Sequence, residues 1–209
     1  MHKFTYLDFV DWFSVKRKMR NILKNRLALS TVVTTLIILV VSVLLAGVVT
    51  YFAINVVSTR VQQESLQVSN VHVWVDGAGV AEAALMVTNT GGRDVVISQI
   101  QVRGQSATIG TGGNVYAAVK AATGDTTPSA LSPVASTAFA TTKPFGTNAL
   151  VAPSSSQLVL SSGGTMAIYI TAPDSVTIND VGLTIGINVF TAQAMYYQET
   201  NVQATTTTL

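Results

Sequence analysis

The chain contains no cysteine, few charged residues and only two histidines. Without cysteine, it forms no disulfide and has no thiol for catalysis. His2 lies near the N-terminus and His72 alternates with valines, so a site with two histidine ligands cannot form within residues 66–209. We therefore expect no catalytic residues, no metal site and no cofactor, and we do not expect an enzyme.

Charged residues make up 11% of the chain, against about 25% in ordinary soluble proteins. Residues 27–59 form a run of 33 residues without a charge or a proline, between Arg26 and Arg60. A membrane core about 30 Å thick is spanned by roughly 20 apolar residues in a helix. The run predicts a membrane-spanning helix over residues 29–65, on the order of 55 Å long, which is longer than anchoring requires.

Seven of the twelve basic residues precede this run, where only Asp8 and Asp11 oppose them. A basic flank before an apolar span places the N-terminus in the cytoplasm and the rest of the chain outside the cell. The chain after residue 28 has five basic and eight acidic residues, a net charge of −3. The overall charge of +2 therefore belongs to residues 1–28 and does not indicate nucleic-acid binding.

The boundary between the basic and apolar segments is unlike a secretory signal peptide. Such a peptide has an apolar region of about 7–15 residues followed by small residues at a cleavage site. Here the apolar run is at least twice as long, and Ala46 and Gly47 lie in its middle. The sequence Asn25-Arg26-Leu27-Ala28-Leu29-Ser30 instead resembles the class III signal peptide of archaeal type IV pilins and archaellins.

In that family a prepilin peptidase cuts before the hydrophobic stretch, so the helix stays with the product. The resemblance implies that Arg26 is the basic determinant, Ala28 precedes the cut, and Leu29 followed by Ser30 begins the mature chain. Residues 1–28 would then be a cytoplasmic leader. Because Leu27 separates Arg26 from Ala28, a cut after Arg26 or Leu27 is the alternative.

The resemblance also implies that the helix leaves the membrane and polymerises with identical helices. Burial of its apolar side chains against one another would stabilise such a bundle by several tens of kcal/mol at most, at about 1.5–3 kcal/mol each. Small residues at 42, 46, 47 and 50 would allow close approach of backbones, although any transmembrane helix tolerates them equally. The residues expected in this contact are Val33, Leu36, Val40, Leu44, Ala46, Gly47 and Val48.

From residue 66 the pattern alternates with period two, as in half-buried strands. Val71, Val73 and Val75 show this clearly, and residues 83–88, 98–102 and 183–189 repeat it. Asp76-Gly77 and the segment 89–92 resemble tight hairpin turns that need positive φ angles. The fold class expected is α+β: a long hydrophobic helix, then an antiparallel β-sandwich head of immunoglobulin-like character over residues 66–209.

Residues 120–157 are rich in Ala, Thr, Ser and Gly and contain four of the five prolines. This interval is too irregular for a core strand and too long for an ordinary loop. We expect a surface excursion held by Phe139 and Phe145 that faces solvent or, in a filament, the next subunit. The threonines at 205–208 are expected to form a frayed end.

Two functions agree with these patterns. In the first, the chain is a prepilin that inserts in the membrane, is processed by prepilin peptidase and polymerises with copies of itself into an extracellular filament for adhesion or motility. In the second, it stays a single-pass membrane protein whose β domain binds a surface partner such as an S-layer or a filament stator. Cleavage near Ala28 and self-assembly separate the two, and the sequence does not distinguish a pilus from an archaellum.

Overall fold

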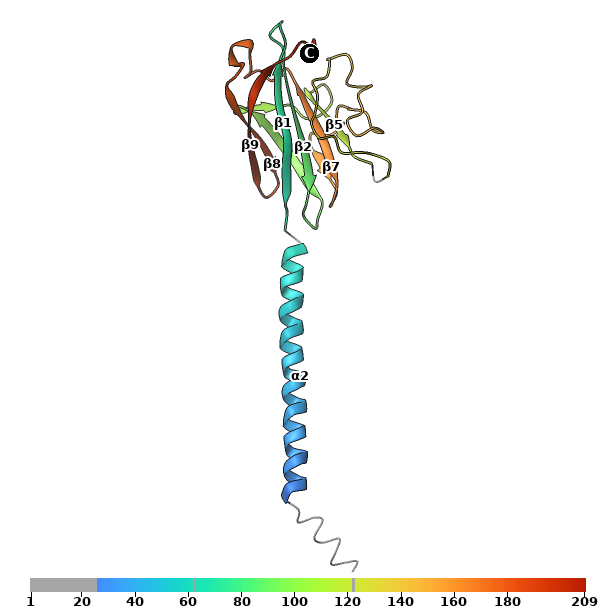
Figure 1. Ribbon diagram of the computed structural model, residues 1–209, viewed down its shortest axis with the longest axis vertical. Helices are drawn as coiled ribbons and strands as arrows, with labels where there is room; N and C mark the ends of the chain where they lie inside the picture. Colours follow the sequence, from blue (N-terminus) through green and yellow to red (C-terminus); the bar gives the residue numbers. More distant parts are fainter. Residues whose placement is uncertain (1–25, 62, 122) are drawn as a thin grey trace, which may run out of the picture. The chain divides into compact units, whose positions relative to one another are not determined.

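The computed structural model describes residues 26–61, 63–121 and 123–209 (Figure 1). The chain divides into two units between Val57 and Ser58, which we describe separately. The first contains most of helix α2, Arg26–Val61, and the second contains a β-rich head. Residues 1–25 of the expected leader lie outside the described residues.

Helix α2 is continuous over 36 residues. Within it, Leu29–Thr59 has a mean hydropathy of 2.9 and is the one helix in the described residues long and apolar enough to cross a membrane. A helix suits that setting because it satisfies every backbone hydrogen-bonding group within the segment. This long apolar helix near the N-terminus confirms the helical part of the prediction.

The helix ends at Val61, earlier than the expected end at residue 65. Beyond it, the Ser65 carbonyl accepts the backbone N–H groups of Thr90 and Gly91 at 2.9 and 3.1 Å. A Cβ on Gly91 would lie 2.8 Å from the Gln63 carbonyl oxygen, so only glycine permits this close approach. Ser65 is therefore bound to a loop of the head, which favours an extended over a helical backbone at this position.

The head contains nine strands and one short 3-10 helix in the described residues. They are β1 Leu66–Val75, β2 Ala81–Asn89, β3 Val95–Val102, β4 Gln105–Ala107, β5 Val115–Val119, β6 Leu158–Leu160, β7 Thr165–Thr171, η1 Ile178–Asp180, β8 Thr184–Thr191 and β9 Met195–Ala204.

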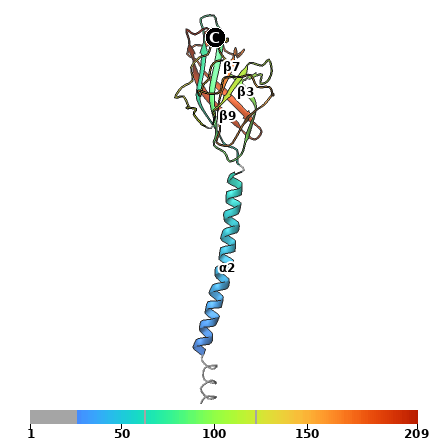
Figure 2. The same cartoon turned by 90° about the vertical axis from the view of Figure 1, so that its right-hand side faces the viewer.

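The strands form one path in the order β4-β3-β8-β9-β1-β2-β7-β5, and β6 pairs with β3 beside β4. All neighbours are antiparallel except β1 and β9, which run parallel where Val73–Val75 meets Val202–Ala204. The path folds at this parallel pair, and strands of both halves surround one interior (Figures 1 and 2). The head is thus a mostly β domain with a nearly closed sheet, and the α+β class is confirmed.

One hydrophobic core fills the space between the halves of the sheet. Its side chains come from alternate positions of the strands, among them Val73, Leu85, Ile97, Ile168 and Ile187, all at most 1% exposed. The alternating pattern identified the inward residues of β1, β2 and β8 correctly, but Leu183 is exposed, and a register shift between Ile97 and Gln99 turns Ile97 instead of Ser98 toward the core. We call this cluster the inner core.

A second core lies on the outer side of β1, β2, β5 and β7. Residues 120–157, which we call the cover segment, pack over this side and form yellow loops beside β5 and β7 in Figure 1. Phe139 stacks on Tyr116 at 4.5 Å between ring centroids and meets Tyr169 edge-on at 6.1 Å. Phe139 and Phe145 are buried, as expected, but the cover segment is a third layer of the head rather than an excursion on its surface.

This layer corrects the expectation that every strand is half-buried. Strand β2 is buried on both sides, because Leu85 and its alternates face the inner core while Ala84 and Met86 face the second core. Period-two alternation shows that a strand has two different sides. It does not show what covers the outer one.

The predicted hairpin at Asp76-Gly77 is present, since β1 pairs with β2, but the positive φ falls on Gly79 at 88°. The predicted hairpin at 89–92 is wrong, because β3 pairs with β8 instead of β2. No residue from 89 to 92 has a positive φ. The buried Asn89 side chain stabilises this crossing by donating to the carbonyls of Arg93 and Leu160 at 2.8 and 3.1 Å.

The frayed C-terminal end is also a wrong prediction. Thr205 donates its backbone N–H to the Val75 carbonyl at 2.9 Å, and Leu209 donates to the Asp76 carboxylate at 3.2 Å. The Leu209 side chain is 8% exposed and belongs to the second core. Leu209 is the one apolar residue after the four threonines, and its packing in the second core is enough to hold the end of the chain against the head.

Candidate functional site: the apolar helix and the outer sides of the head

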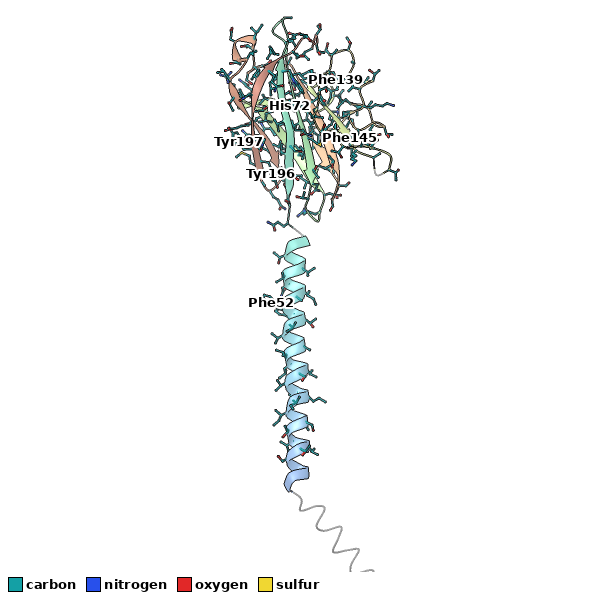
Figure 3. All side chains as sticks on the ribbon, in the orientation of Figure 1. Phe52, His72, Phe139, Phe145, Tyr196 and Tyr197 are labelled. Atoms are coloured by element: carbon teal, nitrogen blue, oxygen red, sulfur yellow. The ribbon has the colours of Figure 1, made fainter. Side chains whose placement is uncertain are left out.

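The seven residues expected to mediate assembly all lie on α2 and are exposed. The larger ones, Val33, Leu36, Val40, Leu44 and Val48, are between 45% and 66% exposed. Apolar side chains surround the helix without a polar stripe, as Figure 3 shows around Phe52. A helix that is apolar on all sides belongs inside a membrane or a protein bundle.

Helical geometry divides the seven residues between two sides of α2. At about 100° per residue, Val33, Leu36, Val40, Leu44 and Gly47 fall within a sector about 80° wide, and Val48 lies about 40° beyond it. Ala46 lies about 120° from the middle of that sector, on a side that it shares with Ser42 and Thr50. Ala46, Ser42 and Thr50 therefore lie apart from the other expected contact residues, and they share their side of the helix with the large residues Val32 and Leu39.

Four hydroxyl groups of α2 donate hydrogen bonds to backbone carbonyls of the same helix. Thr34, Ser42 and Thr50 donate to the carbonyls four residues earlier at 2.7–2.8 Å, and Thr35 donates to Val32 at 2.9 Å. Such bonds remove the need for water at these positions. These four positions of α2 are therefore compatible with lipid or with another helix.

The expected processing site, Arg26 to Ser30, lies in the first turns of α2. Leu29 is 70% exposed, and the Ser30 carbonyl accepts the Thr34 hydroxyl. The peptide bond between Ala28 and Leu29 is thus within regular helix in the uncut chain. Cleavage there stays a prediction.

The two outer sides of the head differ. The outer side of β1, β2, β5 and β7 is covered by the cover segment, whereas the outer side of β3, β4, β6, β8 and β9 has no covering layer in the described residues. We call the latter the open face. Met195 and Tyr197 on this face are 57% and 54% exposed, and the register places them beside Phe190 and Asn188.

Charge is almost absent from the open face. Its five strands contain one charged residue, Glu199, whose carboxylate accepts the Tyr197 hydroxyl at 2.8 Å. Gly186 lies under the Tyr197 ring, since a Cβ there would meet the ring carbons. The Tyr197 ring thus covers a glycine of the neighbouring strand instead of extending into solvent.

A groove of about 360 Å³ lies on the cover segment. Three of the five prolines line it together with Leu131, Val134, Tyr169 and short side chains. The Tyr169 hydroxyl donates to the Ser132 carbonyl at 3.0 Å, which holds the segment against β7. The groove presents mainly apolar surface.

Beneath the cover segment lies a buried carboxyl group. Glu82 of β2 is 1% exposed and accepts the Val134 backbone N–H at 3.0 Å. Burial raises the pKa of Glu82 to about 8, and the single N–H bond opposes that shift only in part. Burial together with the Glu82 charge also raises the pKa of the Tyr169 hydroxyl. At neutral pH, Glu82 is mostly protonated.

In the described residues, no three His, Asp or Glu side chains are placed to hold a metal ion. His72 is half-buried and stacks on Trp74 with ring centroids 5.3 Å apart, which gives it a packing role. The Arg103–Asp180 pair at 2.7 Å joins the β3–β4 turn to η1. No model of a known protein family matches the chain, and no curated protein has a significantly similar sequence.

Sequence reasoning did not identify Glu82, Asn89 or Gly91 as important residues. Glu82 interrupts an apolar strand at an outward position, where a charged residue ordinarily meets water. Asn89 and Gly91 belong to the segment that the sequence predicts as a tight turn. Their roles depend on segments far away in the sequence, so no local pattern could reveal them.

Proposed function

We propose that the chain is the structural subunit of an extracellular filament of the type IV pilus or archaellum kind, polymerised through α2. Helix α2 carries this proposal. Its nineteen large apolar side chains between Leu29 and Val57 are 45–72% exposed in the single chain. Once outside a membrane, such a surface has to be covered, and identical helices can cover it on all sides.

The length of α2 favours a filament over a simple anchor. The 31 residues of Leu29–Thr59 extend over about 46 Å, against about 30 Å for a membrane core. The satisfied hydroxyls and the uncharged surface make the same helix acceptable in lipid before assembly. Processing at Ala28–Leu29 by a prepilin peptidase would release it from the basic leader.

We also propose that the head is immunoglobulin-like, on the basis of its strand order. The order β1-β2-β7-β5 corresponds to strands A-B-E-D, and β9-β8-β3 corresponds to G-F-C. Strand β4 extends the second half as the additional strands of variable-type domains do. An experimental structure in which β2 pairs with β3 would contradict this assignment.

The test is intact mass and N-terminal sequencing of the protein sheared from the cell surface. We expect a mature chain that begins at Leu29 or within two residues of it, in a fraction that contains filaments. An Ala28→Asp variant tests the same step, since it should leave the full-length chain in the membrane fraction. An uncut Met1 chain found only in membranes would contradict the filament and favour the anchored β-domain protein that binds a surface partner.

A further inference from the structure

The open face and the groove lie on opposite outer sides of the same head. Figure 3 shows Tyr197 on the β8–β9 side, and Phe139 and Phe145 on the side of β5 and β7. The inner core separates the two sides, because the inward residues of both halves of the sheet meet there. If the open face of one head contacts the groove side of the next, the same contact can therefore form again at every following head along a filament.

We propose that the open face of one copy docks against the cover segment of the next copy, with Tyr197 and Met195 against the proline-lined groove. The inference rests on the proposed filament, in which all helices point the same way. A polar filament needs contacts between two different surfaces, because a surface that pairs with itself closes into a dimer. The two outer sides of this head supply such a pair of surfaces.

The side chains on the two surfaces are chemically complementary. Rows of neighbouring residues on the open face run from Gln99 through Phe190 to Met195, and from Gln101 through Asn188 to Tyr197. They combine apolar side chains with amides that donate and accept hydrogen bonds. Aromatic side chains favour proline-rich surfaces, and the groove walls include Pro128, Pro133 and Pro144.

The charges are complementary as well. The open face carries Glu199 alone, whereas the cover segment has two lysines and one aspartate, Lys120, Lys143 and Asp125. Lys143 is exposed between two groove residues, Thr142 and Pro144. An acidic residue on one surface and a net positive charge on the other favour this orientation over contact between two open faces, which would bring the two Glu199 carboxylates of a pair onto one interface.

The size of the open face explains why a second copy is the fitting partner. Four strand positions by about seven residues give a footprint of roughly 20 by 23 Å, or about 450 Å². A stable interface between free proteins buries about 800 Å² on each side. The contact is therefore too small to hold two heads together alone, but it suits heads that α2 has already concentrated.

Cross-linking in filaments tests the contact, and the absence of native cysteine makes it specific. The full chain would carry Asn188→Cys, which the register places beside Tyr197, and Ala130→Cys in the groove wall, so that Tyr197 and Met195 stay in place. After mild oxidation, we expect a ladder of trimers and longer species on a non-reducing gel. The matched control joins Ala130→Cys with Ala78→Cys, an exposed position in the loop between β1 and β2, neither of which belongs to the open face, and should remain monomeric.

Each result decides the proposal. Filaments of normal yield without a ladder would overturn it, and so would dimers from Asn188→Cys alone, which would mean that two open faces pair. Failure of the unaltered chain to form a sheared polymer would overturn the filament itself, before any variant is made. As a second measurement, Glu199→Lys should reduce the ladder about two- to fivefold and Lys143→Glu in the same chain should restore it.

Discussion

The covered and open sides of the head are formed by the same kind of strand, but their outward side chains differ in burial. On the covered side, Ala84, Met86 and Tyr169 are almost fully buried beneath the cover segment. On the open face, Met195 and Tyr197 stay more than half exposed. The comparison shows that the burial of an outward strand residue depends on a distant segment of chain and not on the strand itself.

The largest expected difference in stability is between truncations of two phenylalanines, one on each side of the head. Phe145 is 1% exposed in the second core, whereas Phe190 lies half-buried on the open face. We expect Phe145→Ala to lower the free energy of unfolding by about 3–5 kcal/mol, because it leaves a cavity. Phe190→Ala should cost less than about 1 kcal/mol.

Urea unfolding of the full chain in detergent micelles measures both variants. Equal losses would mean that the cover segment does not form a packed layer, and the contrast between the two sides would fail.

The second prediction uses the buried carboxyl group under the cover segment. Because the pKa of Glu82 is about 8 in the folded chain and near 4.5 when unfolded, the folded state binds the extra proton between these values. Stability should therefore be greatest below about pH 4.5 with respect to this group, and fall as pH rises toward 8, by at most about 1.4 kcal/mol per pH unit.

Glu82→Gln should remove this dependence, because the amide cannot ionise and still accepts the Val134 N–H. Thermal unfolding from pH 5 to pH 9 compares the two chains. The lowered pKa values of Asp76 and Asp180, caused first by backbone N–H bonds from Val80 and Thr177, act in more acidic solution and do not interfere. Parallel pH profiles would show that Glu82 is accessible to water.

The smallest expected change in stability comes from enlarging a small residue on each side of the head. Ala167 is fully buried in the second core, so Ala167→Leu should overfill it and cost about 1–3 kcal/mol. Gly186→Ala on the open face should cost less, since the Tyr197 ring that it meets is exposed and can rotate away. Thermal unfolding measures both, and a larger loss for Gly186→Ala would mean that the open face is tightly packed.

Some of these features could be read from the sequence because they depend on neighbouring residues. The uncharged run predicted α2, and the alternating valines predicted which residues of β1 and β2 face the inner core. The processing residues and the assembly side of α2 remain expectations, because a single chain has no peptidase and no second helix. Glu82 could not be recognised, since an outward carboxylate and a buried one look the same along the chain.

The sequence by itself determined the helix, the strands β1, β2, β3 and β8, and the near absence of charge, because apolar runs and alternation act over a few residues. Only the tertiary structure decided that β3 crosses to the other half of the sheet, that the cover segment buries one outer side, and that Leu209 packs beneath it. Those outcomes depend on contacts between residues up to 133 positions apart, such as Leu209 with Asp76. Local preferences carry no information about such contacts, because their free energy appears only when the chain has folded.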